Sequence, residues 1–334
     1  VFVTGATGFV GSWLTRRLVE LGHDVHILAR SSSDLSDLPK DKLTIHIGDV
    51  TSLNSLKKAL KDMEAVFHLA GVVGYSRAQR SLMEQVNVEG TSNVIAACIH
   101  NSVERLIYMS SVVAVGASLD GKEPLTENSV YNMKSFDLGY FETKRIAELN
   151  VLRAYEDDGL DCVILNPSTI YGPGDAKKGS RGVQLKVAKG KFPFYTSGGV
   201  SIVSINDVVD AMIKAWRVGR SGERYILCGE NISIKQLFEL IANEAGVEPP
   251  KKFLPNFAVK AIGKFGDLME FFGKKGPLNS ENATVAIMYH WFKHDKAKNE
   301  LGLKPKPAKD CIAESVKWSK DNGIPVGPGR GSGA

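Results

Sequence analysis

Short apolar runs of strand length alternate with amphipathic stretches of helical length through the first half of the chain. Runs such as "AVFHLAG" and "RLIYMSS" are nearly all apolar, as expected for parallel strands that helices cover on both faces. Strands are predicted at residues 1–4, 24–29, 43–47, 65–70, 105–110 and 161–166, and helices at 9–21, 53–61, 82–100 and 137–155. The pattern predicts an α/β fold with a Rossmann-type, doubly wound parallel sheet.

The rhythm changes after Pro167. Gly and Pro become frequent, a helix is predicted at 208–218 and a strand at 224–228, and the chain is mainly helical from residue 233 onward. Four prolines interrupt this last part, namely Pro249, Pro250, Pro255 and Pro277. We therefore predict a Rossmann domain built from 1–166 and 200–229, a smaller, mainly helical lobe built from 167–199 and 230–326, and a flexible tail at 327–334.

The composition is that of an ordinary globular protein. Of the 334 residues, 43% are hydrophobic and 24% are charged, and no apolar stretch is long enough to span a bilayer. The cysteines are scattered without a CxxC or Cys/His cluster, which predicts buried free thiols, a reducing, cytoplasmic setting and no metal site. They are Cys98, Cys162, Cys228 and Cys311.

The net charge of +5 is unevenly distributed, because residues 250–334 carry 15 Lys plus Arg against 8 Asp plus Glu. The basic residues are interleaved with polar and apolar ones, which is typical of a solvated surface. No nucleic-acid-binding motif accompanies them, so nucleic acid is not expected as a partner.

Three glycines, Gly5, Gly8 and Gly11, follow the first predicted strand and open the first predicted helix. A strand–turn–helix of this kind brings backbone N–H groups and a helix N-terminus against a pyrophosphate. We expect Gly5 to permit the turn, Gly8 to let the backbone approach the phosphates, and Gly11 to let the helix pack on the strand. The alternative is a glycine-rich turn that serves packing alone; the strand before it and the helix after it favour dinucleotide binding.

The end of the second strand bears on which dinucleotide binds. A carboxylate there would bond the ribose hydroxyl of NAD, but this chain has Arg30 followed by serines, which suit the extra phosphate of NADP. NADP(H) is therefore predicted as the preferred cofactor. Asp34 lies close enough to keep NAD(H) possible. Further cofactor contacts are expected after the third strand, at Asp49 and Val50, and after the fourth, at Leu69, Ala70 and Gly71.

A tyrosine four residues before a lysine on a helix places both side chains on one face, where the ammonium could lower the pKa of the phenol. Two such pairs occur, Tyr140 with Lys144 and Tyr289 with Lys293. Only the first lies on a helix that leads from one sheet strand to the next, so it is the predicted acid/base pair.

Two serines, Ser110 and Ser111, stand at the carboxyl end of the fifth predicted strand, where ligands of open α/β sheets bind. A hydroxyl there could hold a substrate carbonyl while Tyr140 gives it a proton. The alternative, serines that only cap the strand, would be preferred without the tyrosine and lysine.

Six motifs occur in the order and spacing of the extended short-chain dehydrogenase/reductases: "TGATGFVG", "HLAG", "NVEGT", "MSSVVAVG", "YFETK" and "NPSTIYGPGD". The chain most resembles the dihydroflavonol-4-reductase-like branch of that family, which is related to the NAD-dependent epimerases and dehydratases. Two later segments, "GERYILCGENISIKQL" and "NELGLKPKP", resemble the bacterial hopanoid-associated sugar epimerases.

The resemblance implies a mechanism with three catalytic residues, Ser111, Tyr140 and Lys144. Tyr140 would be the acid/base, and Lys144 would bind the nicotinamide ribose and lower the pKa of the tyrosine. Hydride would pass between the nicotinamide and a carbon that bears oxygen. The resemblance also implies a homodimer in which the helix predicted at 137–155 takes part in a four-helix bundle.

The predicted cofactor contacts combine the turns above with residues that the resemblance supplies. Pro167, Ser168 and Ile170 would line the carboxamide side of the nicotinamide, and Asn87 would support the site from its helix. The full set is Gly5, Thr7, Gly8, Phe9, Val10, Gly11, Arg30, Asp49, Val50, Leu69, Ala70, Gly71, Asn87, Tyr140, Lys144, Pro167, Ser168 and Ile170.

Two departures separate this chain from the nucleotide-sugar epimerases that it resembles. Thr169 stands where they carry an Asn, and Val200 stands where they carry an Arg that clamps the diphosphate. Both changes remove polar partners for a diphosphate, which favours a smaller or more apolar carbonyl substrate. The apolar run at 253–273 could wall such a pocket or form a plain core helix.

The sequence therefore predicts an NADP(H)-dependent reductase of a ketone or aldehyde, with a small-molecule substrate in the smaller lobe. The alternatives are an NAD-dependent nucleotide-sugar epimerase or dehydratase, a 3β-hydroxysteroid-type dehydrogenase, and a non-catalytic dinucleotide-binding sensor.

Overall fold

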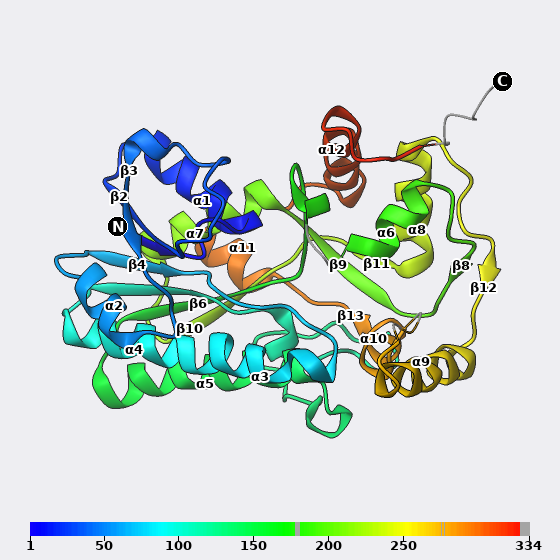
Figure 1. Cartoon of the computed structure of the whole chain (residues 1–334), viewed down its shortest axis with the longest axis horizontal. Helices are drawn as coiled ribbons and strands as arrows, with labels where there is room; N and C mark the ends of the chain where they lie inside the picture. The colour runs from blue at the N-terminus through cyan, green and yellow to red at the C-terminus, as the bar shows by residue number, and fades with distance from the viewer. Residues whose placement is uncertain (178–180, 275, 277, 328–334) are drawn as a thin grey trace.

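The computed structural model describes residues 1–177, 181–274, 276 and 278–327 (Figure 1). Pro277 and all of the predicted tail after Gly327 lie outside the described residues.

Seven parallel strands form the large sheet, in the order β10-β6-β5-β4-β1-β2-β3. Every predicted strand is present, with ends that differ by at most two residues, and the predicted Rossmann-type α/β fold is confirmed. The strands are β1 (Phe2–Thr4), β2 (Val25–Ala29), β3 (Leu43–Ile47), β4 (Ala65–His68), β5 (Arg105–Met109), β6 (Cys162–Pro167) and β10 (Glu223–Leu227).

Helices cover both faces of the large sheet, so alternate residues of a strand enter different cores. In β6, Val163 and Leu165 belong to the core that also holds apolar residues of helices α1, α7 and α11, whereas Cys162 and Ile164 belong to the core shared with α2, α4 and α5. These helices are α1 (Phe9–Glu20), α2 (Leu53–Ala59), α4 (Gly90–His100), α5 (Gly139–Asp158), α7 (Ile205–Val218) and α11 (Asp295–Leu301). The helix predicted at 82–100 is a composite: α3 (Arg80–Met83), a π-helical segment η3 (Glu84–Glu89) and α4.

A second, smaller sheet has the order β11-β9-β13, with β7 also paired to β9. It comprises β7 (Thr169–Tyr171), β9 (Gly199–Ser204), β11 (Asn231–Ser233) and β13 (Tyr289–His290). Helices α6 (Gly182–Ala188), α8 (Ile234–Ala245) and α12 (Ala308–Asp321) share its apolar core. The predicted domain boundary at residue 200 falls inside β9, so that strand belongs with the small sheet; the two-lobe division itself stays a prediction.

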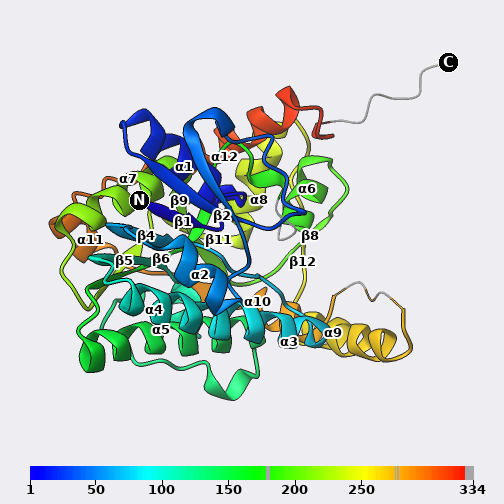
Figure 2. The same ribbon diagram turned by 60° about the vertical axis from the view of Figure 1, so that its left-hand side comes forward.

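The apolar run at 253–273 forms β12 (Lys252–Phe253), which pairs with β8 (Phe194–Tyr195), and then helix α9 (Asn256–Phe271). The next helix, α10 (Ser280–Val285), packs against α9. A plain core helix is the wrong interpretation of α9, because only Val259, Gly263 and Gly266 are buried and most of its large apolar side chains face solvent. Figure 2 shows α9 projecting from the body of the molecule.

Because all seven strands of the large sheet are parallel, their carboxyl ends meet at one edge. The glycine turn follows β1, Arg30 follows β2, and Ser111 follows β5. The fold therefore gathers segments that are far apart in sequence at the edge where open α/β sheets bind ligands.

Candidate active site

The glycine turn after β1 has the geometry that the motif predicts. Gly5 has a φ of 70°, and a Cβ there would lie 2.6 Å from the amide nitrogen of Ala70. A Cβ on Gly11 would lie 2.0 Å from the carbonyl oxygen of Gly5, so helix α1 packs directly on the turn. Both positions therefore require glycine for reasons internal to the protein.

Gly8 differs from the other two glycines. It is exposed, and a Cβ there would meet only the carbonyl oxygen of Gly5, at 3.2 Å. Helix α1 begins at Phe9 without a side-chain cap and without an acidic residue in its first turn. An exposed backbone and an uncapped helix start fit a pyrophosphate, which accepts hydrogen bonds from such N–H groups.

The ends of β2 and β3 lie side by side, because the Gly48 N–H donates to the Ala29 carbonyl at 3.0 Å. Arg30 is exposed at this corner. Asp49 is held in place by the N–H and hydroxyl of Thr51, which both donate to its Oδ1 at 2.9 Å. The corner thus offers one cation and one carboxylate to a ligand that lies across the sheet edge.

Asn87 joins two walls of the site from the π-helical segment η3. Its Oδ1 accepts from the Val72 N–H at 2.7 Å, and its Nδ2 donates to the Val72 carbonyl at 2.9 Å and to the Thr143 hydroxyl at 3.2 Å. The segment after β4, which begins with Leu69, Ala70 and Gly71, is thereby fixed against α5. Asn87 is buried, so its role is support rather than contact with a substrate.

Two of the three predicted catalytic residues meet directly. Ser111 caps the short helix η4 (Val112–Ala114) and hydrogen bonds to Tyr140, which is half-buried in the first turn of α5. Burial raises the pKa of Tyr140, and the bond from Ser111 opposes that rise. A neutral phenol beside a hydroxyl is suited to hold a carbonyl oxygen and give it a proton.

Lys144 lies one helical turn further along α5, and its ammonium is buried. It donates to the Met109 carbonyl at 2.8 Å and to the Tyr108 hydroxyl at 3.1 Å. Burial lowers the pKa of Lys144 to about 8, with Glu148 opposing the shift. Burial and Ser111 account for the direction of the Tyr140 pKa, so the effect of Lys144 on that phenol stays a prediction.

A buried carboxylate, Glu148, lies on α5 one turn beyond Lys144 and was not predicted. Its Oε2 accepts from the Ser110 hydroxyl and from Asn166 Nδ2, both at 2.6 Å, and its Oε1 lies 3.2 Å from an Arg224 nitrogen. Asn166 Nδ2 also donates to the carbonyl of Ser111 at 3.0 Å. Ser110 is thus committed to this network, which leaves Ser111 as the serine that faces Tyr140.

The spacing along α5 could have revealed Glu148. Tyr140, Lys144 and Glu148 recur every four residues, so they form one row on the helix. A carboxylate in such a row, beside a buried cation, signals an ion network below the site.

The other Tyr–Lys pair is not part of this site. Tyr289 lies in strand β13 with its ring 4.9 Å from that of Trp291, and Lys293 is not on a helix with it. The pair therefore lacks the helical geometry that brings Tyr140 and Lys144 onto one face.

Pro167 ends β6, and Ser168 and Ile170 follow at the same sheet edge. The hydroxyl oxygen of Ser168 is buried and has no hydrogen-bond partner among the described residues. A buried hydroxyl of this kind fits the polar carboxamide of a nicotinamide ring.

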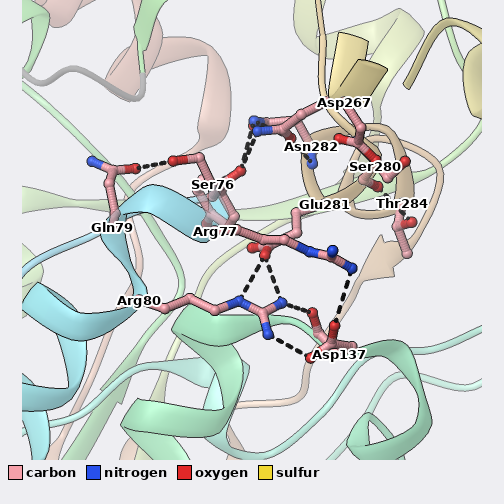
Figure 3. A network of polar contacts seen from close by, with 12 residues as sticks. Ser76, Arg77, Gln79, Arg80, Asp137, Asp267, Ser280, Glu281, Asn282 and Thr284 are labelled. Carbon is pink, nitrogen blue, oxygen red and sulfur yellow. Dashed lines mark hydrogen bonds and ion pairs between the residues drawn. The ribbon is translucent and has the colours of Figure 1, made fainter. Parts of the chain in front are cut away.

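A polar clamp ties the α9–α10 hairpin to the start of α5 (Figure 3). The Arg80 guanidinium bonds Asp137 Oδ1 at 2.6 Å and Glu281 Oε1 at 2.7 Å. These bonds join α3, the segment just before α5, and α10. Next to it, Asn279 donates to the Tyr75 carbonyl at 2.6 Å. The Tyr75 ring in turn packs edge-on against that of Tyr140, with centroids 5.8 Å apart. The clamp therefore ties the α9–α10 hairpin to the surroundings of the Tyr140 phenol.

Two kinds of feature are not found in the part of the chain that the structure describes. Its residues contain no group of three or more His, Cys, Asp or Glu placed to hold a metal ion. Its helices include none with the length and apolar character to cross a membrane. The four cysteines are free and buried.

Known proteins resemble this chain along nearly its full length. Residues 1–228 match the NAD dependent epimerase/dehydratase family. The chain is 30% identical over 331 residues to "Putative dihydroflavonol 4-reductase" of Synechocystis sp., covering 96% of this chain and 95% of that protein. It is 29% identical over 330 residues to sterol demethylase protein B of Methylococcus capsulatus, covering 96% and 98%. Among solved structures, the crystal structure of gox2253 superposes with a TM-score of 0.86 at 35% identity, covering 97% of this chain and 98% of that one.

Proposed function

The chain belongs to the NAD dependent epimerase/dehydratase family, and on that premise we propose that it is an NADP(H)-dependent reductase of a ketone or aldehyde, similar to dihydroflavonol 4-reductases. The observation that carries the proposal is the contact between Ser111 and Tyr140 at the carboxyl end of β5, with Lys144 one turn further along the helix. A hydroxyl, a phenol and a buried ammonium in this arrangement can orient a carbonyl and protonate its oxygen.

Each catalytic side chain has a separate task in this proposal. Ser111 donates to the substrate oxygen and orients the carbonyl, and Tyr140 gives that oxygen its proton. Lys144, fixed by the Met109 carbonyl, presents an ammonium to the cofactor ribose. The nicotinamide supplies hydride chemistry when bound. Asn87 and the Glu148 network hold α5 in a fixed position against the ends of the strands.

The preference for NADP(H) over NAD(H) rests on Arg30, which is exposed at the corner formed by β2 and β3. A guanidinium there pairs with a phosphate in a bidentate geometry. We expect NADPH to bind more tightly than NADH, and Arg30→Ala to remove most of the difference. Equal affinities for the two cofactors in the unsubstituted protein would contradict this preference.

The substrate is proposed to be small or apolar. Thr169 and Val200 stand where a diphosphate-binding site would need polar partners, and one relative is named for a sterol. A 3β-hydroxysteroid-type dehydrogenase is therefore a substrate variant of the same proposal.

A nucleotide-sugar epimerase is the second candidate, because the matching family includes epimerases. The two differ in cofactor retention: an epimerase keeps its dinucleotide through a cycle, whereas a reductase exchanges it at every turnover. Mass spectrometry of the dinucleotide released from freshly purified, denatured protein tests this. Stoichiometric NAD would overturn the reductase, and an empty site that takes up NADPH would support it. A non-catalytic sensor would bind the dinucleotide but have no turnover for a substitution of Tyr140 to abolish.

We further propose a cytoplasmic homodimer. Four free thiols suit a reducing compartment, and α4 packs beside α5 on the outer face of the sheet, as a four-helix interface requires. Light scattering tests the assembly, and a monomer would contradict it.

A further inference from the structure

Helix α9 and the residue after it expose a continuous row of large apolar side chains, here called the α9 face. Their exposed fractions are high: Phe257 77%, Phe265 57%, Leu268 54%, Phe271 81% and Phe272 68%. Phe257, Phe265, Leu268 and Phe272 are separated by multiples or near-multiples of a helical turn, so they lie on one side of the helix. An exposed apolar residue outside such a row, such as Val130 at 87%, is normal for a protein surface.

The exposure of the α9 face is fixed by packing on the opposite side of the helix. A Cβ on Gly266 would lie 1.8 Å from the Leu278 carbonyl oxygen, and one on Gly263 would lie 2.7 Å from the Ala283 Cβ. Asp267 Oδ1 also accepts from the Ser280 N–H at 3.0 Å. The helix is thus seated on α10 by its small residues, and rolling the phenylalanines inward would break this contact.

Lysines surround the α9 face. Lys260 and Lys264 lie on the helix beside the phenylalanines, and others lie just before and after it, at Lys251, Lys252 and Lys274. All five are exposed, the exposed acids of the helix are Asp267 and Glu270, and Lys251 is ion-paired with Glu248 at 2.6 Å. The local charge is therefore positive, in the part of the chain that also carries the excess of basic residues.

We propose that the α9 face docks on an anionic lipid surface. Aromatic side chains on one side of a helix, with Lys260 at the border and Lys264 among them, match a helix that lies in the plane of a membrane interface. The phenylalanines would enter the boundary of the acyl chains, and the lysines would meet the phosphate groups with their apolar stems along the lipid. The projecting position of α9 in Figure 2 suits a flat partner.

The same hairpin is connected to the catalytic residues. Glu281 on α10 bonds Arg80, and Asn279 holds the Tyr75 carbonyl, whose side chain packs against Tyr140. Docking would therefore bring the site close to the lipid, and an apolar carbonyl compound dissolved there would be its substrate class. This last step rests on the proposed function; the docking itself does not.

The test is flotation of the full chain with vesicles of phosphatidylcholine alone or mixed with phosphatidylglycerol. We expect binding to the anionic vesicles only, weakened at about 0.5 M salt by screening. The pair F265D/F272D and the pair K260E/K264E should each lower the partition coefficient about tenfold or more. Val130→Asp and K57E/K58E, which make matched changes elsewhere on the surface, should leave it unchanged.

Three results would overturn the proposal: no binding to anionic vesicles, binding that the α9 variants retain, or a self-association in light scattering that these variants abolish. NADPH binding and thermal unfolding check that the variants fold. Because flotation needs no turnover, its failure is distinct from failure of the reductase proposal. Should the aspartates prevent folding, Leu268→Cys carries a polarity-sensitive dye selectively, since the native thiols are buried. A blue shift on anionic vesicles supports docking, and its absence contradicts it.

Discussion

Two helices of this protein reverse the usual distribution of side chains. Helix α5 turns a polar row inward, in which Lys144 and Glu148 are buried. Helix α9 turns an apolar row outward, in which Phe257 and Phe271 are among the most exposed hydrophobic residues of the described chain. Buried charges and exposed aromatic rows are both costly, so each requires a partner.

The difference lies in where the partner is found. On α5 the partners are within the chain: the Met109 carbonyl for Lys144, and Ser110 with Asn166 for Glu148. On α9 the small residues satisfy the inner side, and the phenylalanines face solvent. The comparison suggests that the polar row serves chemistry inside the protein and the apolar row serves contact with something outside it.

The largest effect should come from the first member of the polar row. Tyr140→Phe removes the proton donor but keeps the ring, so turnover should fall by about a thousandfold while cofactor affinity changes little. Steady-state rates and a fluorescence titration with NADPH measure the two quantities.

Tyr289→Phe is the matched control, because it alters the other Tyr–Lys pair of the chain and should leave turnover nearly unchanged. Equal losses of turnover in both variants would mean that the two substitutions act by destabilising the fold. The assignment of Tyr140 as the proton donor would then fail.

The next effect concerns the last member of the row. Glu148→Ala leaves Arg224 and Ser110 without their carboxylate, and removal of one partner from a buried ion pair should cost about 3 kcal/mol of unfolding free energy. Urea denaturation measures this cost. Glu156→Ala, on the exposed end of the same helix, should change the value by less than about 0.5 kcal/mol. A similar loss of unfolding free energy in both variants would show that the buried ion pairs of Glu148 do not stabilise the fold.

A smaller, pH-dependent effect is expected at Lys144, whose pKa burial lowers from 10.5 to about 8. Between these values the unfolded chain binds a proton that the folded chain has released, so stability rises with pH across the window. Below pH 8 both states are protonated, and the folded state bears the full cost of burying the charge.

The test compares wild type with Lys144→Met. The unfolding free energy of wild type relative to the variant should increase by on the order of 2 kcal/mol between pH 8 and pH 10.5. Urea titrations at several pH values measure the difference. A difference that falls as pH rises would contradict the lowered pKa.

Much of the fold could be predicted from the sequence because each strand of the large sheet carries its own local signal. The run "AVFHLAG" is apolar enough to be buried on both faces. Gly11 is required by a contact with Gly5, six residues away, whereas Gly5 itself is required by a contact with Ala70 that only the folded chain creates. The small sheet was missed, because β7 and β13 are short and are paired through β9, far away in sequence. Such strands have no periodicity of their own to detect.

The site was predictable to a similar extent. Tyr140 and Ser111 lie together as expected, since their places at a strand end and a helix start are local features. The Arg80 clamp was not predicted, because it joins residues about 200 positions apart, and the direction of the Lys144 ammonium depends on the Met109 carbonyl. The interpretation of the apolar run at 253–273 as a core helix was also wrong, because hydrophobicity alone does not say whether an apolar face is covered.

The smallest effect on stability should come from the apolar row. Phe265→Ser removes a ring that is 57% exposed, so little apolar surface returns to water on unfolding, and the unfolding free energy should change by less than about 0.5 kcal/mol. Phe141→Ser removes a fully buried ring next to Tyr140 in the chain and should cost several times more unfolding free energy. Urea denaturation of both variants measures the contrast. If Phe265→Ser were as destabilising as Phe141→Ser, the α9 face would be a core surface that another part of the chain covers in solution, and the contrast between the two helices would collapse. If it is neutral, the phenylalanine is not kept for the stability of this chain, and a role in contact with a partner is what remains.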